Sequence, residues 1–285
     1  MLRYHWEDLP DSVRREVQDE LGTIVRAVPV PEGQSCSAAL ALYRDELPPV
    51  FLKGVHGVSR EMRWLRNEIS SAKRVRGIAP AVAFHRDIDD WLIAAFEYVG
   101  GRPVSLAPGS PDLPAVASAL DRIGAIRAPE LKSLGERWKT SWWQRVAEEK
   151  PHVLNGWRLD ELTAWERHVP EVLIGDHLLH TDLHEDQFVV TSGGDIRVVD
   201  WGWPASGAPW VDPAFLVLRL IGAGHPPDAA EAWARAHTRW ALASVEEITT
   251  FAVYVAGLWT YRATTESLAQ LARNYANWRL GGTSS

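Results

Sequence analysis

The sequence has little cysteine and no long apolar run, and these two shortages exclude whole classes of protein. Cys36 is the single cysteine among 285 residues, so the chain cannot form an internal disulfide. No stretch approaches the roughly 20 consecutive apolar residues that a membrane-spanning helix needs. The first ten residues, MLRYHWEDLP, lack the apolar core of a secretory signal peptide. We therefore expect a cytoplasmic protein with no membrane partner.

Positive charge is also in short supply. Lysine and arginine number 30 against 37 acidic residues, which gives a formal net charge of −7. The sequence pI is near 5.8, whereas a domain that binds nucleic acid usually has a clear basic excess. We therefore expect no nucleic-acid partner. Hydrophobic residues make up 46% and charged residues 24% of the chain, as in a globular protein with a sizeable core.

The first hundred residues read mainly as β-strands. A helix is expected over 7–21, where Pro10 suits a first turn and Gly22 stops the pattern. A second helix is expected over 59–75, and the sequence Gly100-Gly101-Arg102-Pro103 then breaks the chain. The β-type runs fall at residues 23–30, 37–44, 49–55, 80–84 and 91–97, the last two joined by a polar turn at 85–90.

From residue 104 the pattern becomes helical. Helices are expected over 112–127, 135–149, 159–173, from Asp212 onward, and over 227–243, 245–264 and 266–279. The sequence thus predicts an α+β fold of two lobes. Residues 1–99 form an N-lobe with a five-stranded antiparallel sheet and a hinge at its end. Residues 100–285 form a mainly helical C-lobe.

Residues 176–203 hold the densest group of chemically active side chains. An apolar lead-in precedes His180, Thr181 and Asp182, and the amide Gln187 follows five residues after the aspartate. The runs QFVV and IRVVDW, joined by a Ser-Gly-Gly-Asp turn, read as a β-hairpin that brings Asp200 back beside Gln187. A carboxylate can accept a proton from a hydroxyl, and carboxylate and amide oxygens suit Mg²⁺.

The spacing H-x-D-x-x-x-x-N/Q, followed by a strand pair and Asp-Trp, resembles the aminoglycoside phosphotransferase family. These small-molecule kinases have a protein-kinase-like fold, commonly with Asp-Trp in place of Asp-Phe-Gly and with Asn where this chain has Gln187. The resemblance implies an ATP- or GTP-dependent phosphotransferase that uses Mg²⁺. It implies that Asp182 deprotonates a substrate hydroxyl and that Gln187 and Asp200 bind the metal. It also implies that His180 and Asp212 support the catalytic loop.

The same resemblance assigns nucleotide-binding residues in the N-lobe. Lys53, at the end of an apolar run, corresponds to the strand lysine that pairs with the α- and β-phosphates. Glu68 is its expected partner in preference to Glu61, which comes too early in the helix. Phe96, Glu97 and Tyr98 form the expected hinge beside the adenine. Gly33, Gln34 and Ser35 lie in the link expected to cover the phosphates.

The acceptor is open at this level. An aminoglycoside, an antibiotic-like compound or another natural product is the leading candidate, and a Ser or Thr of a peptide is the alternative. A polycationic acceptor needs carboxylates, and a flatter acceptor could use the tryptophans, of which the chain has fifteen. Candidate carboxylates are Glu185, Asp186, Glu231, Glu246 and Glu247. Candidate tryptophans are Trp201, Trp203, Trp210, Trp233, Trp240 and Trp259.

Two other classes of function compete with the kinase. His177, His180 and His184, with the aspartates between them, could form a transition-metal cluster of a hydrolase. The substitution at Gln187 and the single glycine in the phosphate link favour a non-catalytic nucleotide-binding protein. The joint presence of Lys53, Asp182 and Asp200 favours an active kinase.

Overall fold

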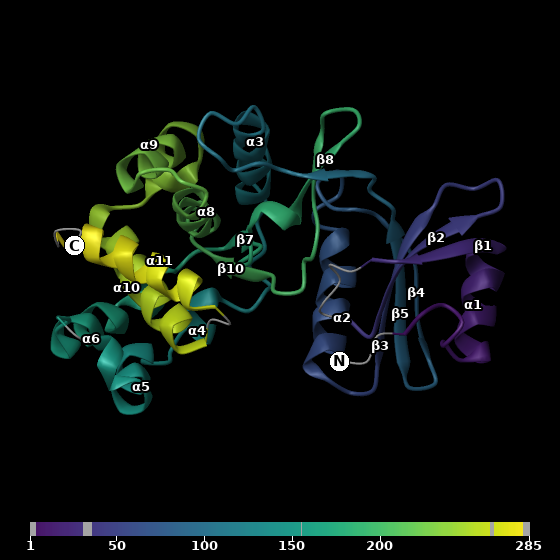
Figure 1. Cartoon of the computed structure of the whole chain (residues 1–285), viewed down its shortest axis with the longest axis horizontal. Helices are drawn as coiled ribbons and strands as arrows, with labels where there is room; N and C mark the ends of the chain where they lie inside the picture. The colour runs from purple at the N-terminus through teal and green to yellow at the C-terminus, as the bar shows by residue number, and fades with distance from the viewer. Residues whose placement is uncertain (1–3, 31–35, 155, 263–264, 282–285) are drawn as a thin grey trace. The chain divides into compact units, whose positions relative to one another are not determined.

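The computed structural model describes residues 4–30, 36–154, 156–262 and 265–281. The chain divides into two compact units (Figure 1). The first unit consists of Met1–Pro103 and Asp186–Pro204, and the second of Val104–Glu185 and Ala205–Ser285. Residues 186–204, which the sequence pattern assigns to the C-lobe, therefore pack with the first unit.

A five-stranded antiparallel sheet forms the centre of the first unit, as the sequence predicts. Its spatial order is β1-β2-β3-β5-β4. The strands are β1 (Ile24–Pro29), β2 (Ala38–Arg44), β3 (Val50–His56), β4 (Val82–Ile88) and β5 (Trp91–Glu97). The expected turn over 85–90 was wrong, because β4 continues to Ile88 and only Asp89 and Asp90 turn the chain. Residues 85–88, although mostly polar, belong to the strand because they pair with residues 91–94 of β5.

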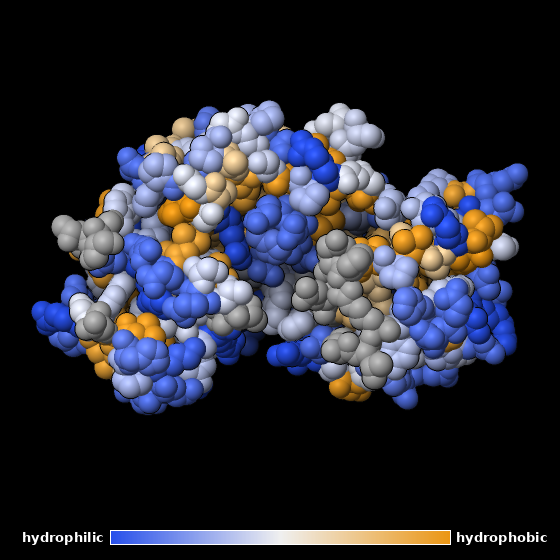
Figure 2. Space-filling model, in the orientation of Figure 1, coloured by the Kyte–Doolittle hydropathy of each residue, from blue (hydrophilic) through white to orange (hydrophobic). Residues whose placement is uncertain are grey.

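Two helices pack on opposite faces of this sheet (Figure 1). Helix α1 (Asp11–Leu21) buries Val13, Val17 and Leu21 against one face. Its outer side carries charged residues, which form a blue surface at the right of Figure 2. Helix α2 (Arg60–Ala72) begins after Ser59, whose side chain accepts a hydrogen bond from the backbone N–H of Met62. This N-cap sets the start of the helix, and Leu65 then packs against the other face of the sheet.

The predicted hairpin is present and is extended by a strand that the sequence pattern missed. Strands β8 (Phe188–Thr191) and β9 (Ile196–Val198) pair antiparallel, and β6 (Gly101–Pro103) adds to the free edge of β8. A Cβ at Gly101 would lie 2.2 Å from the carbonyl oxygen of Val190, so only glycine fits there. This pairing explains why the hairpin packs with the first unit, although the chain break at Gly100 indicates a boundary.

The described residues of the second unit are mainly helical, with one short antiparallel pair of β7 (His177–Leu179) and β10 (Ala205–Gly207). The expected helices over 135–149 and 159–173 are each broken in two, and the expected helix over 227–243 ends in a 3₁₀ turn. Within the described residues, no helix is long and apolar enough to cross a membrane. The helices are α3 (Leu113–Gly124), α4 (Leu134–Arg137), α5 (Trp142–Glu149), η1 (Pro151–Leu154), α6 (Leu159–Arg167), α7 (Val169–Val172), α8 (Val211–Gly222), α9 (Pro227–His237), η3 (Arg239–Leu242), α10 (Val245–Arg262) and α11 (Glu266–Arg279).

Candidate active site

Lys53 occupies the middle of a charged cluster in the first unit. Strand β3 directs it toward α2, and only 5% of the residue is exposed. Its Nζ lies 3.0 and 2.9 Å from the two carboxylate oxygens of Glu68. The same ammonium also donates to Oδ1 of Asp200. Glu61 instead pairs with Arg60. The structure thus brings together Lys53, Glu68 and Asp200, three of the residues singled out from the sequence.

Burial and charge act in opposite directions on this cluster. Burial by itself would lower the pKa of Lys53, but the carboxylates of Glu68 and Asp200 raise it above its ordinary value. Burial raises the pKa of Glu68, and the ammonium of Lys53 only partly offsets that effect. The lysine is therefore a fixed positive charge. The Asp200 side chain, 40% exposed, keeps access to solvent.

The hairpin of β8 and β9 places Gln187 next to the segment that ends at Asp200. The backbone carbonyl of Gln187 accepts a 2.9 Å hydrogen bond from the N–H of Val199. Gln187 is 7% exposed. Asp200 has a φ of 63°, the left-handed conformation that turns the chain at the end of the hairpin. The amide and the carboxylate proposed as metal ligands therefore lie at the same end of one hairpin.

Helix α2 contacts the residues after Asp200 through two side chains that sequence reasoning missed. The side-chain nitrogen of Asn67 donates a 3.0 Å hydrogen bond to the carbonyl of Gly202. The rings of Trp64 and Trp203 lie 4.7 Å apart. A Cβ at Gly202 would lie only 3.2 Å from the Cβ of Trp64. No local pattern marks Asn67 or Trp64, because their partners are more than 130 residues away in sequence.

The expected hinge residues lie at the end of strand β5: Phe96 and Glu97 are its last two residues, and Tyr98 follows it. Phe96 is buried, and its ring centroid lies 5.9 Å from Nζ of Lys53. Glu97 is exposed and forms an ion pair of 2.8 Å with Arg197. Tyr98 lies with its ring 6.4 Å from that of Tyr43. The expected phosphate-covering residues Gly33, Gln34 and Ser35 lie outside the described residues.

In the second unit, the loop after β7 is fixed by a carboxylate of α8. The backbone N–H groups of His180 and Thr181 donate to Oδ2 and Oδ1 of Asp212 at 2.7 and 2.9 Å. Burial raises the pKa of Asp212 to about 6, although the two hydrogen bonds act to lower it. His180 is completely buried, while Asp182 is exposed. This arrangement holds the loop backbone and leaves Asp182 at the surface of its unit.

Arg219 of α8 is a further charged residue near this loop, and no motif in the sequence marks it. Burial lowers its pKa, and the negative charges of Asp182 and Glu185 oppose that shift. Its guanidinium lies 5.0 Å from the ring centroid of Trp259. Within the described part of the chain, the buried Nε atom has no hydrogen-bond partner. Arg219 therefore supplies positive charge beside Asp182.

The competing metal cluster is not formed by the described residues. None of the described histidine, cysteine, aspartate and glutamate side chains form a group of three or more that could hold a metal ion. Nδ1 of His177 instead contacts the carbonyl of Gly124 at 2.6 Å. Of the suggested acceptor carboxylates, Glu231 is buried in an ion pair with Arg279, and Glu247 binds the backbone N–H of Ser244. Half of the suggested tryptophans are packing residues: Trp201, Trp210 and Trp240 are buried, whereas Trp203 is 45% exposed.

Comparison with solved structures finds the same fold in small-molecule kinases. Choline kinase LicA from Streptococcus pneumoniae has a TM-score of 0.65 at 11% identity, covering 94% of this chain and 98% of its own. A putative fructosamine-3-kinase from Haemophilus somnus 129PT has a TM-score of 0.60 at 16% identity, with 97% and 98% covered. A thermostable mutant of aminoglycoside phosphotransferase APH(4)-Ia, in ternary complex with AMP-PNP and hygromycin B, has a TM-score of 0.59 at 16% identity, with 95% and 96% covered.

Sequence comparison gives the family directly. A search of curated proteins finds no match. The model of the phosphotransferase enzyme family, APH, matches residues 32–248. This match spans most of the chain and includes Lys53, Asp182 and Asp200. The expected protein-kinase-like fold is confirmed, and this chain belongs to the phosphotransferase enzyme family.

Proposed function

We propose that this protein transfers the γ-phosphoryl group of ATP or GTP to a hydroxyl group of a small molecule. The observation that carries the proposal is the cluster of Lys53, Glu68 and Asp200 in the first unit. An isolated lysine is normally solvated, whereas this one is buried between two carboxylates. Such an arrangement fixes a positive charge where the phosphates of a nucleotide would need it.

The residues of the hairpin fit a Mg²⁺ ion. The ion prefers hard oxygen ligands, which the carboxylate of Asp200 and the amide of Gln187 both offer. Asp200 also pairs with the ammonium of Lys53, which keeps its carboxylate beside the charge that would meet the phosphates. Bound there, Mg²⁺ would neutralise charge on the nucleotide phosphates. In the nucleotide complex Lys53 would contact phosphate oxygens, and Glu68 would keep the ammonium in place.

Asp182 is the proposed general base. It follows His180 and Thr181, whose backbone N–H groups are held by Asp212. An exposed carboxylate on a fixed loop can orient an acceptor hydroxyl and accept its proton as the phosphoryl group leaves the nucleotide. Phosphoryl transfer needs little covalent help from the protein, so positioning and charge would supply most of the rate.

A small-molecule acceptor is supported by the relatives. The structures similar to this chain include a choline kinase, a putative fructosamine-3-kinase and a phosphotransferase in complex with hygromycin B. These acceptors differ in charge and size but share an alcohol group. Both positive and negative charges surround Asp182 in this chain, because Arg219 interacts electrostatically with Asp182 and Glu185. We therefore propose an alcohol acceptor, with an aminoglycoside or another natural product as the class to screen first.

The test is an acceptor screen that measures ADP or GDP release. Aminoglycosides, aminocyclitols, amino alcohols, ketosamines and nucleosides would each be incubated with the protein, Mg²⁺ and either nucleotide. Mass spectrometry would then show a phosphate added to the acceptor. The proposal predicts at least one acceptor with release well above the rate of nucleotide hydrolysis.

Two variants separate the proposed roles. Asp182→Asn should abolish transfer and leave nucleotide binding unchanged, because the residue acts on the acceptor. Lys53→Met should weaken nucleotide binding itself. Transfer by Asp182→Asn at the wild-type rate would contradict the assignment of the base, and nucleotide hydrolysis without any phosphorylated product would contradict the proposed acceptor chemistry.

A further inference from the structure

The second unit contains a cavity built from different elements than the proposed catalytic loop. Its volume is about 360 Å³, at the lower end of the range for small-molecule sites. Its wall comes from α9, η3, the start of α10 and the end of α11, whereas the catalytic loop follows β7 and rests on α8. We propose that this cavity binds a small aromatic carboxylate, at a site separate from those for nucleotide and acceptor.

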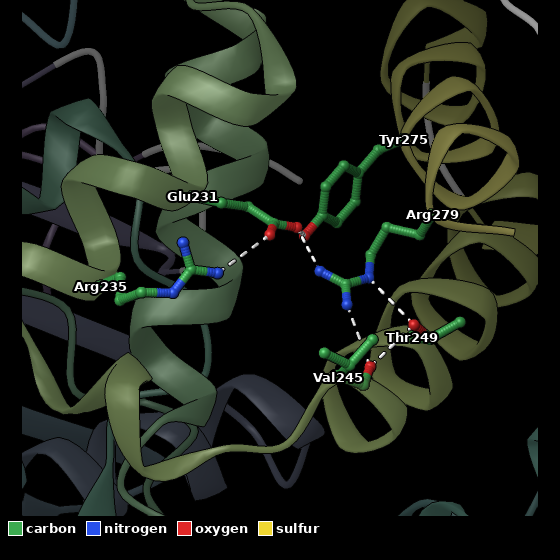
Figure 3. A network of polar contacts seen from close by, with 6 residues as sticks. All are labelled: Glu231, Arg235, Val245, Thr249, Tyr275 and Arg279. Carbon is green, nitrogen blue, oxygen red and sulfur yellow. Dashed lines mark hydrogen bonds and ion pairs between the residues drawn. The ribbon is translucent and has the colours of Figure 1, made fainter. Parts of the chain in front are cut away.

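One side of the cavity is fixed by a buried polar network (Figure 3). The side chains of Glu231 and Arg279 are 8% and 6% exposed and form an ion pair. Tyr275 donates a 2.7 Å hydrogen bond to the same oxygen of Glu231. Arg279 also donates to the hydroxyl of Thr249 and to the carbonyl of Val245, both at 3.0 Å. In these contacts the charges of Glu231 and Arg279 neutralise each other, and the hydrogen bonds hold this wall in one conformation.

Arg235 is the group left for a ligand. Its Nη2 lies 3.7 Å from Oε2 of Glu231, which is longer than a hydrogen bond. Across the described residues its guanidinium makes no hydrogen bond, and its side chain is 59% exposed. A guanidinium presents parallel donors that match a carboxylate. The hydroxyl oxygen of Ser244 accepts from the N–H of Glu247 at 3.2 Å, so its hydrogen can be donated to the same ligand.

The charge of the wall favours an anion. Two arginines, Arg235 and Arg279, and one carboxylate, Glu231, line the cavity. The wall therefore carries one excess positive charge. A single carboxylate would neutralise that charge, whereas a cationic ligand would add to it and compete with Arg235 for Glu231.

The remaining wall favours an aromatic body. Trp240 and Ile248 are buried to 2% exposure and line the cavity together with Trp278. Val245, which also lines the cavity, is 69% exposed. A ring placed against the indole of Trp278 and the side chain of Val245 would cover apolar surface that now faces water.

The test uses 3-phenylpropionate as the probe and its uncharged amide as the matched control ligand. Both would be titrated into the full-length protein by calorimetry. The indole N–H signal of Trp278, assigned through Trp278→Phe, would be followed by NMR. The proposal predicts that the acid binds at least about tenfold more tightly than the amide and shifts the Trp278 signal. No binding of the acid at about 10 mM, or equal binding of acid and amide, would overturn it.

Variants locate the binding to the cavity. Arg235→Leu should weaken binding of the acid at least about tenfold, since it removes the carboxylate partner while the Glu231–Arg279 pair remains. Arg158→Leu removes an arginine outside the cavity whose side chain is also largely exposed, at 74%, and this variant should bind the acid like wild type. Ala243→Phe, which fills the cavity without changing charge, should abolish binding. Wild-type binding by both Arg235→Leu and Ala243→Phe would overturn the proposal. None of these measurements needs phosphoryl transfer.

Discussion

The side-chain amide of Asn67 donates a 3.0 Å hydrogen bond to the backbone carbonyl of Gly202, two residues beyond Asp200. This bond joins helix α2, which also carries Glu68, to the segment that follows the proposed metal ligand. Trp64 of the same helix contacts Trp203, the residue that follows Gly202 in the sequence. Helix α2 therefore positions both partners of Lys53, one directly and one through the backbone.

Replacement of Asn67 should weaken the proposed Mg²⁺ site without unfolding the protein. Asn67→Leu removes one hydrogen bond, which is typically worth about 1 kcal/mol. We expect the Mg²⁺ concentration for half-maximal activity to rise several-fold, with little change in melting temperature. Arg66→Ala is the matched control, because Arg66 is the preceding residue on the helix and pairs with exposed Asp87. An equal effect of both variants would argue against a positioning role.

Substitution of Asp212 should destabilise the second unit. Asp212→Ala leaves two backbone N–H groups, those of His180 and Thr181, without their acceptor. Loss of the partner of a buried donor costs about 1–3 kcal/mol each. Asp212→Asn retains one acceptor oxygen and should lose less. Urea unfolding measures both effects, and Asp160→Asn, at an exposed carboxylate, should show almost none.

Arg219 should affect the pH dependence of the reaction. Its guanidinium interacts electrostatically with the carboxylate of Asp182. Arg219→Met should therefore move the acidic limb of the pH–rate profile to higher pH, and Arg219→Lys should restore most of the wild-type profile. A merely structural role would lower the rate at every pH without moving the limb.

Glu166 should make folding stability fall as pH rises. It is buried, and burial raises its pKa to about 7, although it accepts hydrogen bonds from Ser141 and from the backbone of Trp142 and Trp143. The folded state thus holds a proton that the unfolded chain releases near pH 4.5. The stabilising contribution is complete below that pH and is lost as pH rises toward about 7.

The control for Glu166 is the uncharged amide. The free energy of unfolding of wild type, relative to Glu166→Gln, should fall by at most about 1.4 kcal/mol per pH unit across this window. Urea titrations at several pH values would measure the difference. A constant difference between the two proteins would show that Glu166 does not titrate there.

The sequence alone predicted the fold class, because strand and helix periodicity and the motif around Asp182 agree with each other. The expected hairpin also forms, since a glycine-rich turn between two β-type runs is a local signal. Strand β6 was missed because Gly101 and Pro103 break local patterns, and only pairing with β8 makes them a strand. The break between α4 and α5, inside the helix expected over 135–149, likewise depends on contacts with residues distant in sequence.

The site was predictable where residues stand in a motif and was hidden where they meet across the chain. Lys53 and Glu68 are 15 residues apart, and the position of Glu61 at the start of the helix allowed Glu68 to be chosen over it. Asn67 and Gly202 are 135 residues apart, so their bond has no sequence signature. Glu231 was a candidate carboxylate for the acceptor site. The sequence around an acidic helix residue does not reveal that Tyr275 and Arg279 bind its side chain in the interior.

The most direct test of the central claim is the melting temperature of the protein with ATP or GTP, with and without Mg²⁺. A ligand that binds only the folded state must raise that temperature. The account predicts a Mg²⁺-dependent increase with at least one nucleotide, and loss of the Mg²⁺-dependent part in Asp200→Ala. No increase with either nucleotide at millimolar concentration, or an undiminished Mg²⁺ effect in Asp200→Ala, would contradict the account.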